Sequence, residues 1–362
     1  MSSPDVLAPA RRSLPALRPP LGDVEPCVPP AGRGAFRRMD ANEGPPPPAG
    51  LLAEALARAA EKLAYYPEYA DLEAAAAEAW GIDPAGVVPV NGADDGIRLA
   101  VQAYCGPGAP LAVPEPAFPM YAFYAATLPA PVLRVPGRLD RPPDADRLIR
   151  VLPYAALAAV VTPGNPVGLR VPEADLERLL AAAGRRPVLA DETYAAFCGQ
   201  DLAPLLRRHP NLVLLRTLSK ACGVPGLRCG FLLADPAVAR QLRRICPPYA
   251  VSAVAAAVGT DLLRLDQDAP VRARAAATEA RALSAWLADR GVETLPSDTH
   301  FFLARLGADA PGRLRAEGIL VKGRGDLGPG LCRVSVAGAD DAEAFREAWV
   351  RLESRPAPGG GS

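Results

Sequence analysis

Residues 217–231 read Thr-Leu-Ser-Lys-Ala-Cys-Gly-Val-Pro-Gly-Leu-Arg-Cys-Gly-Phe, and this stretch decides the fold that we expect. It follows an apolar run, 212–215, whose composition predicts a buried strand. Lys220 is preceded by two hydroxyl side chains and followed eight positions later by Arg228. An amine in such a place can form a Schiff base with an aldehyde, while hydroxyls and a guanidinium can bind a phosphate.

Pyridoxal phosphate carries both an aldehyde and a phosphate, and proteins bind it through such a lysine. Thr217, Ser219 and Arg228 supply the phosphate-binding groups that this interpretation requires. The alternative is that Lys220 is a solvated surface lysine with no special role. The glycines and prolines around Lys220, and partner residues earlier in the chain, favour the cofactor.

The composition limits the classes of protein to which the chain can belong. Its 362 residues are enough for about two domains, and 40 basic side chains balance 40 acidic ones, so nothing indicates a nucleic-acid or membrane surface. No apolar run reaches the roughly 18 residues that indicate a membrane span. The seven cysteines never form a Cys-x-x-Cys pair and there are two histidines, so we expect reduced thiols, no metal site and a cytoplasmic location.

Short apolar segments alternate with helical segments over the first two thirds of the chain. The apolar segments lie at 87–90, 111–113, 158–162, 188–190, 212–215 and 231–233. Such alternation predicts an α/β fold, in which helices cover both faces of a mostly parallel sheet. Ligands bind such sheets beyond the carboxyl ends of the strands. Four candidate residues follow strands in this way, namely Asn165, Asp191, Tyr194 and Lys220.

Two other segments are candidates for binding the cofactor. The segment 91–96, Asn-Gly-Ala-Asp-Asp-Gly, joins a predicted strand to a predicted helix. Free N–H groups at a helix start favour phosphate, although the segment can also be an ordinary connection. Phe118 and Tyr121 follow the strand at 111–113, and either ring can stack on a planar cofactor or belong to the core.

The chain changes character after residue 247. The segments that follow are helical at 251–265, 270–290 and about 341–352, with short strands at 301–303 and 331–336. We predict a large cofactor-binding domain over 46–247 and a smaller α+β domain over 248–354. Residues 1–45 are expected to form an N-terminal arm that joins the smaller domain, and residues 355–362 a disordered tail.

Together these residues resemble the fold-type I aminotransferases that use pyridoxal phosphate, most closely the histidinol-phosphate aminotransferase group. The resemblance runs from Asn42 to Val336, and it is carried by Asn165, Asp191, Tyr194, Lys220 and Arg228 in this order. It implies transfer of an amino group between a small-molecule amino donor and a 2-oxo acid such as 2-oxoglutarate. It also implies a homodimer whose active sites are shared between the subunits.

The resemblance further implies a role for each matching residue. Lys220 would link to the cofactor and move the substrate proton, and Asp191 would keep the ring nitrogen protonated. Asn165 and Tyr194 would bond the ring oxygen, so that Lys220, Asp191 and Tyr194 form the catalytic set. The other cofactor-binding residues would be Ala93, Asp94, Phe118, Thr217, Ser219 and Arg228, with Tyr66 contributed by the neighbouring subunit.

The substrate side of the site departs from the family pattern. The predicted substrate-binding set is Arg333, Asn42, Lys322, Arg324, Cys27 and His300. Arg333 would bind a carboxylate with its planar fork, although a structural ion pair is the alternative. Cys27 stands where an aromatic residue is usual, Lys322 where an arginine is usual, and His300 where an asparagine is usual. We therefore expect an amino acid with a free carboxylate to be preferred to histidinol phosphate.

Several other interpretations share parts of this pattern. Histidinol-phosphate aminotransferase of histidine biosynthesis is the first alternative, and decarboxylases of threonine phosphate or oxidases on the same scaffold are the next. The sequence does not separate these. A nicotinamide dehydrogenase would need a Gly-x-Gly-x-x-Gly turn after a strand, and a pyridoxal-phosphate-binding transcription regulator would need a basic DNA-binding domain; the sequence offers neither.

Overall fold

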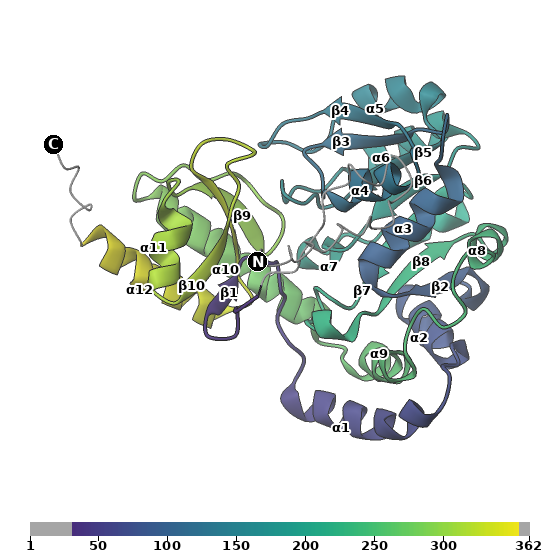
Figure 1. The fold of residues 1–362 in the computed structure, drawn as a ribbon, viewed down its shortest axis with the longest axis horizontal. Helices are drawn as coiled ribbons and strands as arrows, with labels where there is room; N and C mark the ends of the chain where they lie inside the picture. Colours follow the sequence, from purple (N-terminus) through teal and green to yellow (C-terminus); the bar gives the residue numbers. More distant parts are fainter. Residues whose placement is uncertain (1–30, 355–362) are drawn as a thin grey trace, which may run out of the picture.

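The computed structural model describes residues 31–354 and contains two β-sheets, each packed with helices (Figure 1). The larger sheet has seven strands, in the order β2 (Val87–Val90), β8 (Gly230–Ala234), β7 (Leu212–Thr217), β6 (Val188–Asp191), β5 (Leu157–Val161), β3 (Leu111–Glu115) and β4 (Val132–Pro136). Only β8 runs against the others within this sheet, because it pairs antiparallel with both β2 and β7. The mostly parallel sheet predicted from the sequence is therefore confirmed.

Helices cover both faces of the larger sheet because its strands carry apolar side chains on both faces. Along β7, Leu212 and Leu214 lie in one core while Val213 and Leu215 lie in the other, as the two-residue period of a strand requires. The first core packs on α1 (Ala49–Ala59), α2 (Ala70–Trp80), α5 (Ala145–Val151), α6 (Glu173–Ala183) and α9 (Ala253–Leu265). The second packs on α3 (Gly92–Tyr104), α4 (Met120–Thr127) and α8 (Pro236–Arg243).

The smaller sheet has four strands, in the order β1 (Arg37–Met39), β10 (Ile319–Gly323), β11 (Leu331–Ser335) and β9 (Phe301–Arg305). One face packs on α10 (Ala269–Ala288), α11 (Ala310–Ala316) and α12 (Ala339–Glu353). β1 pairs parallel with β10, although the two strands lie near opposite ends of the chain. Neither β1 nor β10 was expected as a strand from the sequence.

Alternation along β11 decides which of its side chains reach the larger sheet. Cys332 and Val334 lie in the core that α10 and α12 share with the smaller sheet. Arg333 and Ser335 point the other way, and Arg333 donates to Asn165 in the loop that follows β5 of the larger sheet. The period of two thus places a guanidinium between the two sheets.

The packing of α9 bears on the predicted domain limits. α9 contacts α1 and α2, and its Val258 and Leu262 lie in the core of the larger sheet. The assignment of residues 248–354 to the smaller domain stays a prediction, and this packing favours a boundary after α9. Cys27, most of the predicted arm and the predicted tail lie outside the described residues. Within 31–354 no helix combines the length and apolar character needed to cross a bilayer.

Candidate active site

The carboxyl ends of three neighbouring strands bring the predicted catalytic residues together. Asp191 is the last residue of β6, and Tyr194 lies just before the short helix α7 (Ala195–Cys198). Lys220 follows β7 by three residues, and Asn165 follows β5 by four. Because β5, β6 and β7 are parallel neighbours, these four side chains lie at one edge of the sheet, where the sequence analysis expects them.

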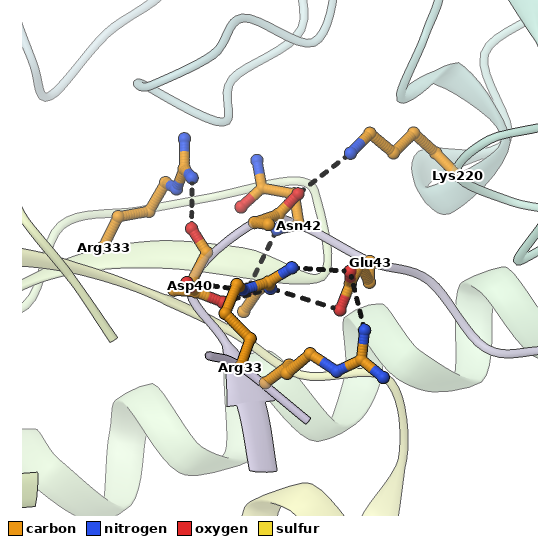
Figure 2. Close-up of polar contacts among 9 residues, drawn as sticks. Arg33, Asp40, Asn42, Glu43, Lys220 and Arg333 are labelled. Carbon is orange, nitrogen blue, oxygen red and sulfur yellow. Dashed lines mark hydrogen bonds and ion pairs between the residues drawn. The ribbon is translucent and has the colours of Figure 1, made fainter. Parts of the chain in front are cut away.

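Lys220 is a half-buried lysine whose charge lies in a poorly solvated place. Its Nζ donates a hydrogen bond to the backbone carbonyl of Ala41 at 3.0 Å (Figure 2). The same atom lies 5.8 Å from the centroid of the Tyr194 ring. Burial first, and then the positive charge of Arg333, lower the pKa of Lys220 from 10.5 to about 8. A neutral amine, the form that attacks an aldehyde, is thus present near neutral pH.

Asp191 is a buried carboxylate held by two donors. Its Oδ2 accepts a hydrogen bond from the hydroxyl of Tyr121 at 2.8 Å, and its Oδ1 accepts one from the backbone N–H of Thr193 at 2.9 Å. Burial raises the pKa of Asp191, since these donors only partly replace the lost water. A protonated ring nitrogen would complement such a carboxylate. Tyr121, which the sequence left open between stacking and core, is a fully buried support for Asp191.

A chain of hydrogen bonds joins the two sheets through Tyr194. Its hydroxyl accepts from Asn42 Nδ2 at 3.2 Å and from Asn165 Nδ2 at 3.4 Å. Arg333 donates to Asn165 Oδ1 and to the backbone carbonyl of Asp40, both at 2.7 Å. Within residues 31–354 no carboxylate pairs with Arg333, and its buried Nε has no hydrogen-bond partner. This geometry favours a guanidinium that is available to a ligand over a structural ion pair.

A second group of donors lies beside the start of α3. Thr217 Oγ1 lies 3.0 Å from Ser219 Oγ, and Arg228 Nη1 donates to Ser219 Oγ at 3.3 Å. The Arg228 guanidinium lies directly against Gly92, where a Cβ would overlap it. Gly92 also has a φ of 74°, a left-handed conformation that favours glycine.

Ala93 and Asp94 lie in the first turn of α3, whose N–H groups have no partner within the helix. Those N–H groups and the guanidinium of Arg228 together can bind a phosphate. The Asp94 carboxylate lies 4.0 Å from Arg228. The whole set therefore fits pyridoxal phosphate: an amine for its aldehyde, a buried carboxylate for its ring nitrogen, and a group of donors for its phosphate.

Three other predicted residues lie outside the group of Lys220, Tyr194, Asn165 and Arg333. Arg324 makes two hydrogen bonds to Asp326, at 2.9 and 2.7 Å, and thereby lowers the pKa of that carboxyl group. Lys322 is exposed and lies opposite Arg333 in the β10–β11 pair. Phe118 is half-buried and packs against the core beneath α3 and α4.

Tyr66 lies apart from the group around Lys220. It follows the short 3₁₀ helix η2 (Ala60–Ala64), and its ring stacks on Tyr249 with the centroids 4.3 Å apart. Both rings are exposed. None of the described hydrogen bonds, ion pairs or ring contacts connects Tyr66 with Lys220 or its neighbours. Its role as a contribution from a second subunit remains a prediction.

The segment 40–44, which we call the strap, runs from β1 past the site toward α1. Lys220 and Arg333 reach it from opposite sides, and Arg33 pairs with Asp40 and Glu43 on it (Figure 2). The backbone N–H of Asn42 donates to Ser335 Oγ at 3.2 Å. Ser335 and the strap carbonyls were not expected from the sequence, because no motif marks a lone serine in a strand or a backbone oxygen as part of a site.

Comparison with known proteins agrees with this arrangement. Residues 33–348 match the model of a family described as "Aminotransferase class I and II". A histidinol-phosphate aminotransferase from Thermococcus gammatolerans is 32% identical over 332 residues, which cover 90% of this chain and 95% of that protein. A histidinol-phosphate aminotransferase from Thermobifida fusca is 32% identical over 333 residues, which cover 88% and 90% of the two chains.

Solved structures share the fold. The histidinol-phosphate aminotransferase of Sinorhizobium meliloti, solved in complex with pyridoxal-5'-phosphate, has a TM-score of 0.82 at 24% identity and covers 95% of this chain and all of its own. The L-threonine-O-3-phosphate decarboxylase of Porphyromonas gingivalis has a TM-score of 0.77 at 20% identity, covering 88% and 99%. These similarities confirm the fold-type I architecture expected from the sequence.

We expect Lys220 to become reactive near pH 8. The chain has three lysines, Lys62, Lys220 and Lys322, so labelling is readily assigned by peptide mass spectrometry. When cofactor-free protein is labelled with an amine reagent over a range of pH, modification of Lys220 should rise with a midpoint of about 8, as its ammonium loses its proton. In protein unfolded by urea the midpoint should return toward 10.5. The same midpoint in both states would show that the fold does not lower this pKa.

Proposed function

The chain belongs to the family of class I and II aminotransferases, and on this basis we propose that it transfers an amino group from an amino acid with a free carboxylate to a 2-oxo acid, using pyridoxal phosphate held at Lys220. The observation that carries the proposal is the meeting of Lys220, Asp191 and Tyr194 from one sheet with Arg333 from the other. The site thus contains both a basic amine, Lys220, and a group that can bind a carboxylate, Arg333. The free thiols among the described cysteines support a cytoplasmic location.

Pyridoxal phosphate, when bound, supplies a carbonyl carbon that links to amines and a ring that withdraws electrons from the carbon losing its proton. Asp191 would hold a proton on the ring nitrogen, because an adjacent carboxylate stabilises the protonated ring. Tyr121 and Thr193 keep both oxygens of Asp191 in position. The ring oxygen would be bonded by Asn165 and Tyr194, and the phosphate by Thr217, Ser219, Arg228 and the N–H groups of Ala93 and Asp94.

Lys220 would carry the proton during the reaction. With a pKa of about 8, Nζ exists in both protonation states near neutral pH. It can therefore accept the proton of the substrate Cα as a base and return it to another carbon as an acid. Arg333 contributes to this balance, since its positive charge disfavours the ammonium form of Lys220.

Arg333 would bind the carboxylate of the substrate. Its two Nη atoms now donate to neutral acceptors, the Asn165 amide oxygen and the Asp40 carbonyl. A carboxylate would replace these by charge-assisted bonds in a bidentate arrangement, which are about twice as strong. A 2-oxo acid also carries a carboxylate, so the same guanidinium would serve the amino donor and the acceptor in turn.

Histidinol phosphate is the second candidate donor, because two relatives with 32% identity are named histidinol-phosphate aminotransferases. The sequence offers Lys322 and Arg324 as the cations for the phosphate of such a substrate. Arg324 already holds Asp326 in a bidentate pair, and Lys322 is an exposed point charge. An amino acid therefore ranks first, and the buried Arg333 is the reason.

We also propose a homodimer with shared active sites. Four exposed apolar side chains support it: Leu63, Tyr65, Tyr66 and Tyr249 are each more than half exposed. Large apolar groups that gather at a surface often mark a contact with another chain. The stacked pair of Tyr66 and Tyr249 would then lie at the subunit interface, where Tyr66 can reach the neighbouring site.

Asp191→Asn should abolish most of the activity while leaving the fold intact. An amide cannot keep the ring nitrogen protonated, so we expect kcat to fall by about 100- to 1,000-fold, the usual effect of losing one preorganised electrostatic group. Transamination kinetics and circular dichroism measure the two outcomes. Asp289→Asn, at an exposed aspartate of the smaller domain, is the matched control. Full activity of Asp191→Asn would refute the assignment of this carboxylate.

Mixing two impaired variants should restore activity if the active sites are shared. A hybrid of Tyr66→Phe and Lys220→Ala subunits contains one site with both native residues. The activity after subunit exchange should therefore exceed the sum of the activities of the two separate proteins. A mixture of Asp191→Asn and Lys220→Ala is the control, because both residues belong to one subunit's site and no native site forms. A fully active monomer in sedimentation would exclude the dimer.

An amino acid should be a better donor than histidinol phosphate. A hydrogen bond to a charged group contributes about 1.5–3 kcal/mol. Lys322, which stands where an arginine is usual, should therefore lower kcat/KM for the phosphate ester at least about tenfold. Steady-state rates for phenylalanine, tyrosine, arginine and histidinol phosphate with 2-oxoglutarate test this, and product analysis separates transamination from decarboxylation and oxidation. Asp326→Asn, which frees Arg324, should raise kcat/KM for histidinol phosphate alone. A kcat/KM for histidinol phosphate above all the others would reverse the ranking.

A further inference from the structure

His300 is a fully buried histidine that the proposed mechanism does not use. Neither ring nitrogen has a hydrogen-bond partner of ordinary geometry among residues 31–354. The ring stacks on Phe197 of α7, with the centroids 3.9 Å apart and the planes 16° from parallel. An aromatic side chain without nitrogens would fill this space equally well, and buried polar atoms without partners are rare in native proteins. The imidazole therefore requires an explanation.

The polar groups that face His300 belong to the strap. The backbone carbonyls of Asn42 and Glu43 lie close enough to favour a proton on the ring, although neither completes a hydrogen bond. The two preceding carbonyls already have donors: Asp40 accepts from Arg333 at 2.7 Å and Ala41 accepts from Lys220 at 3.0 Å. Successive carbonyls of the strap thus meet Arg333, Lys220 and His300.

The first two of these donors are needed elsewhere when the site is in use. Lys220 is the residue proposed to link to the cofactor, and Arg333 is the residue proposed to bind the substrate carboxylate. Each must then give up its strap carbonyl in whole or in part. His300, which the sequence placed among the candidate substrate-binding residues, has no part in the proposed mechanism. Its ring stacks on Phe197 and lies beside Tyr194.

The imidazole is suited to this place because it carries no charge. Burial first, and then the neighbouring Lys220, lower the pKa of His300 to about 3. A neutral imidazole offers one N–H donor and adds no third cation beside Lys220 and Arg333. A lysine or an arginine would add that charge, and a phenylalanine would lack the donor.

We propose that His300 is a positioning residue that holds the strap over the active site while Lys220 and Arg333 are engaged. Its single ring N–H donates to the backbone carbonyl of Asn42 or Glu43, which requires only a small movement of the strap toward the ring. The strap then keeps Asn42 at the hydroxyl of Tyr194. The inference rests on the proposed function for what occupies Lys220 and Arg333.

Two substitutions separate this role from simple space filling. His300→Phe keeps a ring that can stack on Phe197 but has no N–H, whereas His300→Asn keeps an amide N–H. His300→Leu takes the place of the phenylalanine variant if that protein does not fold. His209→Phe is the matched control, because it makes the same change at the second histidine, which lies near Glu177 on the surface of the larger domain.

Hydrogen exchange of peptides covering 39–46 provides a readout independent of turnover. In protein loaded with pyridoxal phosphate and 2-oxoglutarate, His300→Phe should raise strap exchange about tenfold, the effect of losing one hydrogen bond. In cofactor-free protein, where Lys220 and Arg333 still hold the strap, the change should be less than about twofold. His300→Asn and His209→Phe should behave like the unaltered chain in both states.

Steady-state kinetics provide the second readout. His300→Phe should raise KM for the amino donor by about five- to tenfold with little change in kcat, because the strap contributes to substrate binding. The proposal would be overturned if the strap of His300→Phe exchanged at the same rate as that of the unaltered chain in the loaded state. It would also be overturned if the substitution raised strap exchange equally with and without cofactor. If the strap responds as expected but no amino acid reacts, the inference survives and the proposed function fails. If amino acids react but His300→Phe does not change strap exchange, the proposed function survives and the inference about His300 fails.

Discussion

Two cations, Lys220 and Arg333, share one poorly solvated site, and among the described residues neither forms an ion pair with a carboxylate. Burial lowers the pKa of both side chains, and the positive charge of Arg333 is the second cause of the lowered pKa of Lys220. Their donors are instead taken by neutral oxygens, those of Ala41, Asp40 and Asn165. Neutral acceptors bind a guanidinium or an ammonium less strongly than carboxylates do. An anionic ligand can therefore displace them.

The strap supplies most of these acceptors, so its close approach to the Lys220 loop matters as much as the side chains do. Gly44 lies against the backbone carbonyl of Lys220, and Gly223 lies against the carbonyl of Pro45. A Cβ at either place would overlap a backbone atom, which cannot move as a flexible side chain can. The two glycines thus allow the N-terminal segment and the lysine loop to pack backbone to backbone.

The sequence was sufficient for the residues that follow strands, because the end of a parallel strand marks a ligand site whatever the details of the fold. Lys220, Asp191 and Asn165 lie at or just after the ends of β7, β6 and β5, as the sequence predicts, and their roles stay predictions. The sequence was insufficient where a side chain reaches the site only through tertiary packing. The Tyr121 ring is visible in the sequence, yet its hydroxyl reaches Asp191 only through the packing of α4 on the sheet. α9 is amphipathic in either domain, so its periodicity does not tell which sheet it covers.

The pairing of β1 with β10 imposes an order on how the protein is completed during synthesis. β1 ends at residue 39, while its partner begins at residue 319. At about 5–20 residues per second, a ribosome needs roughly 15 to 60 s to produce the intervening chain. The strap is anchored on one side by β1 and on the other by Ser335 and Arg333, so it cannot settle before that time. A nascent chain can therefore form the larger sheet early, but it gains a complete catalytic centre only after β10 and β11 have been made.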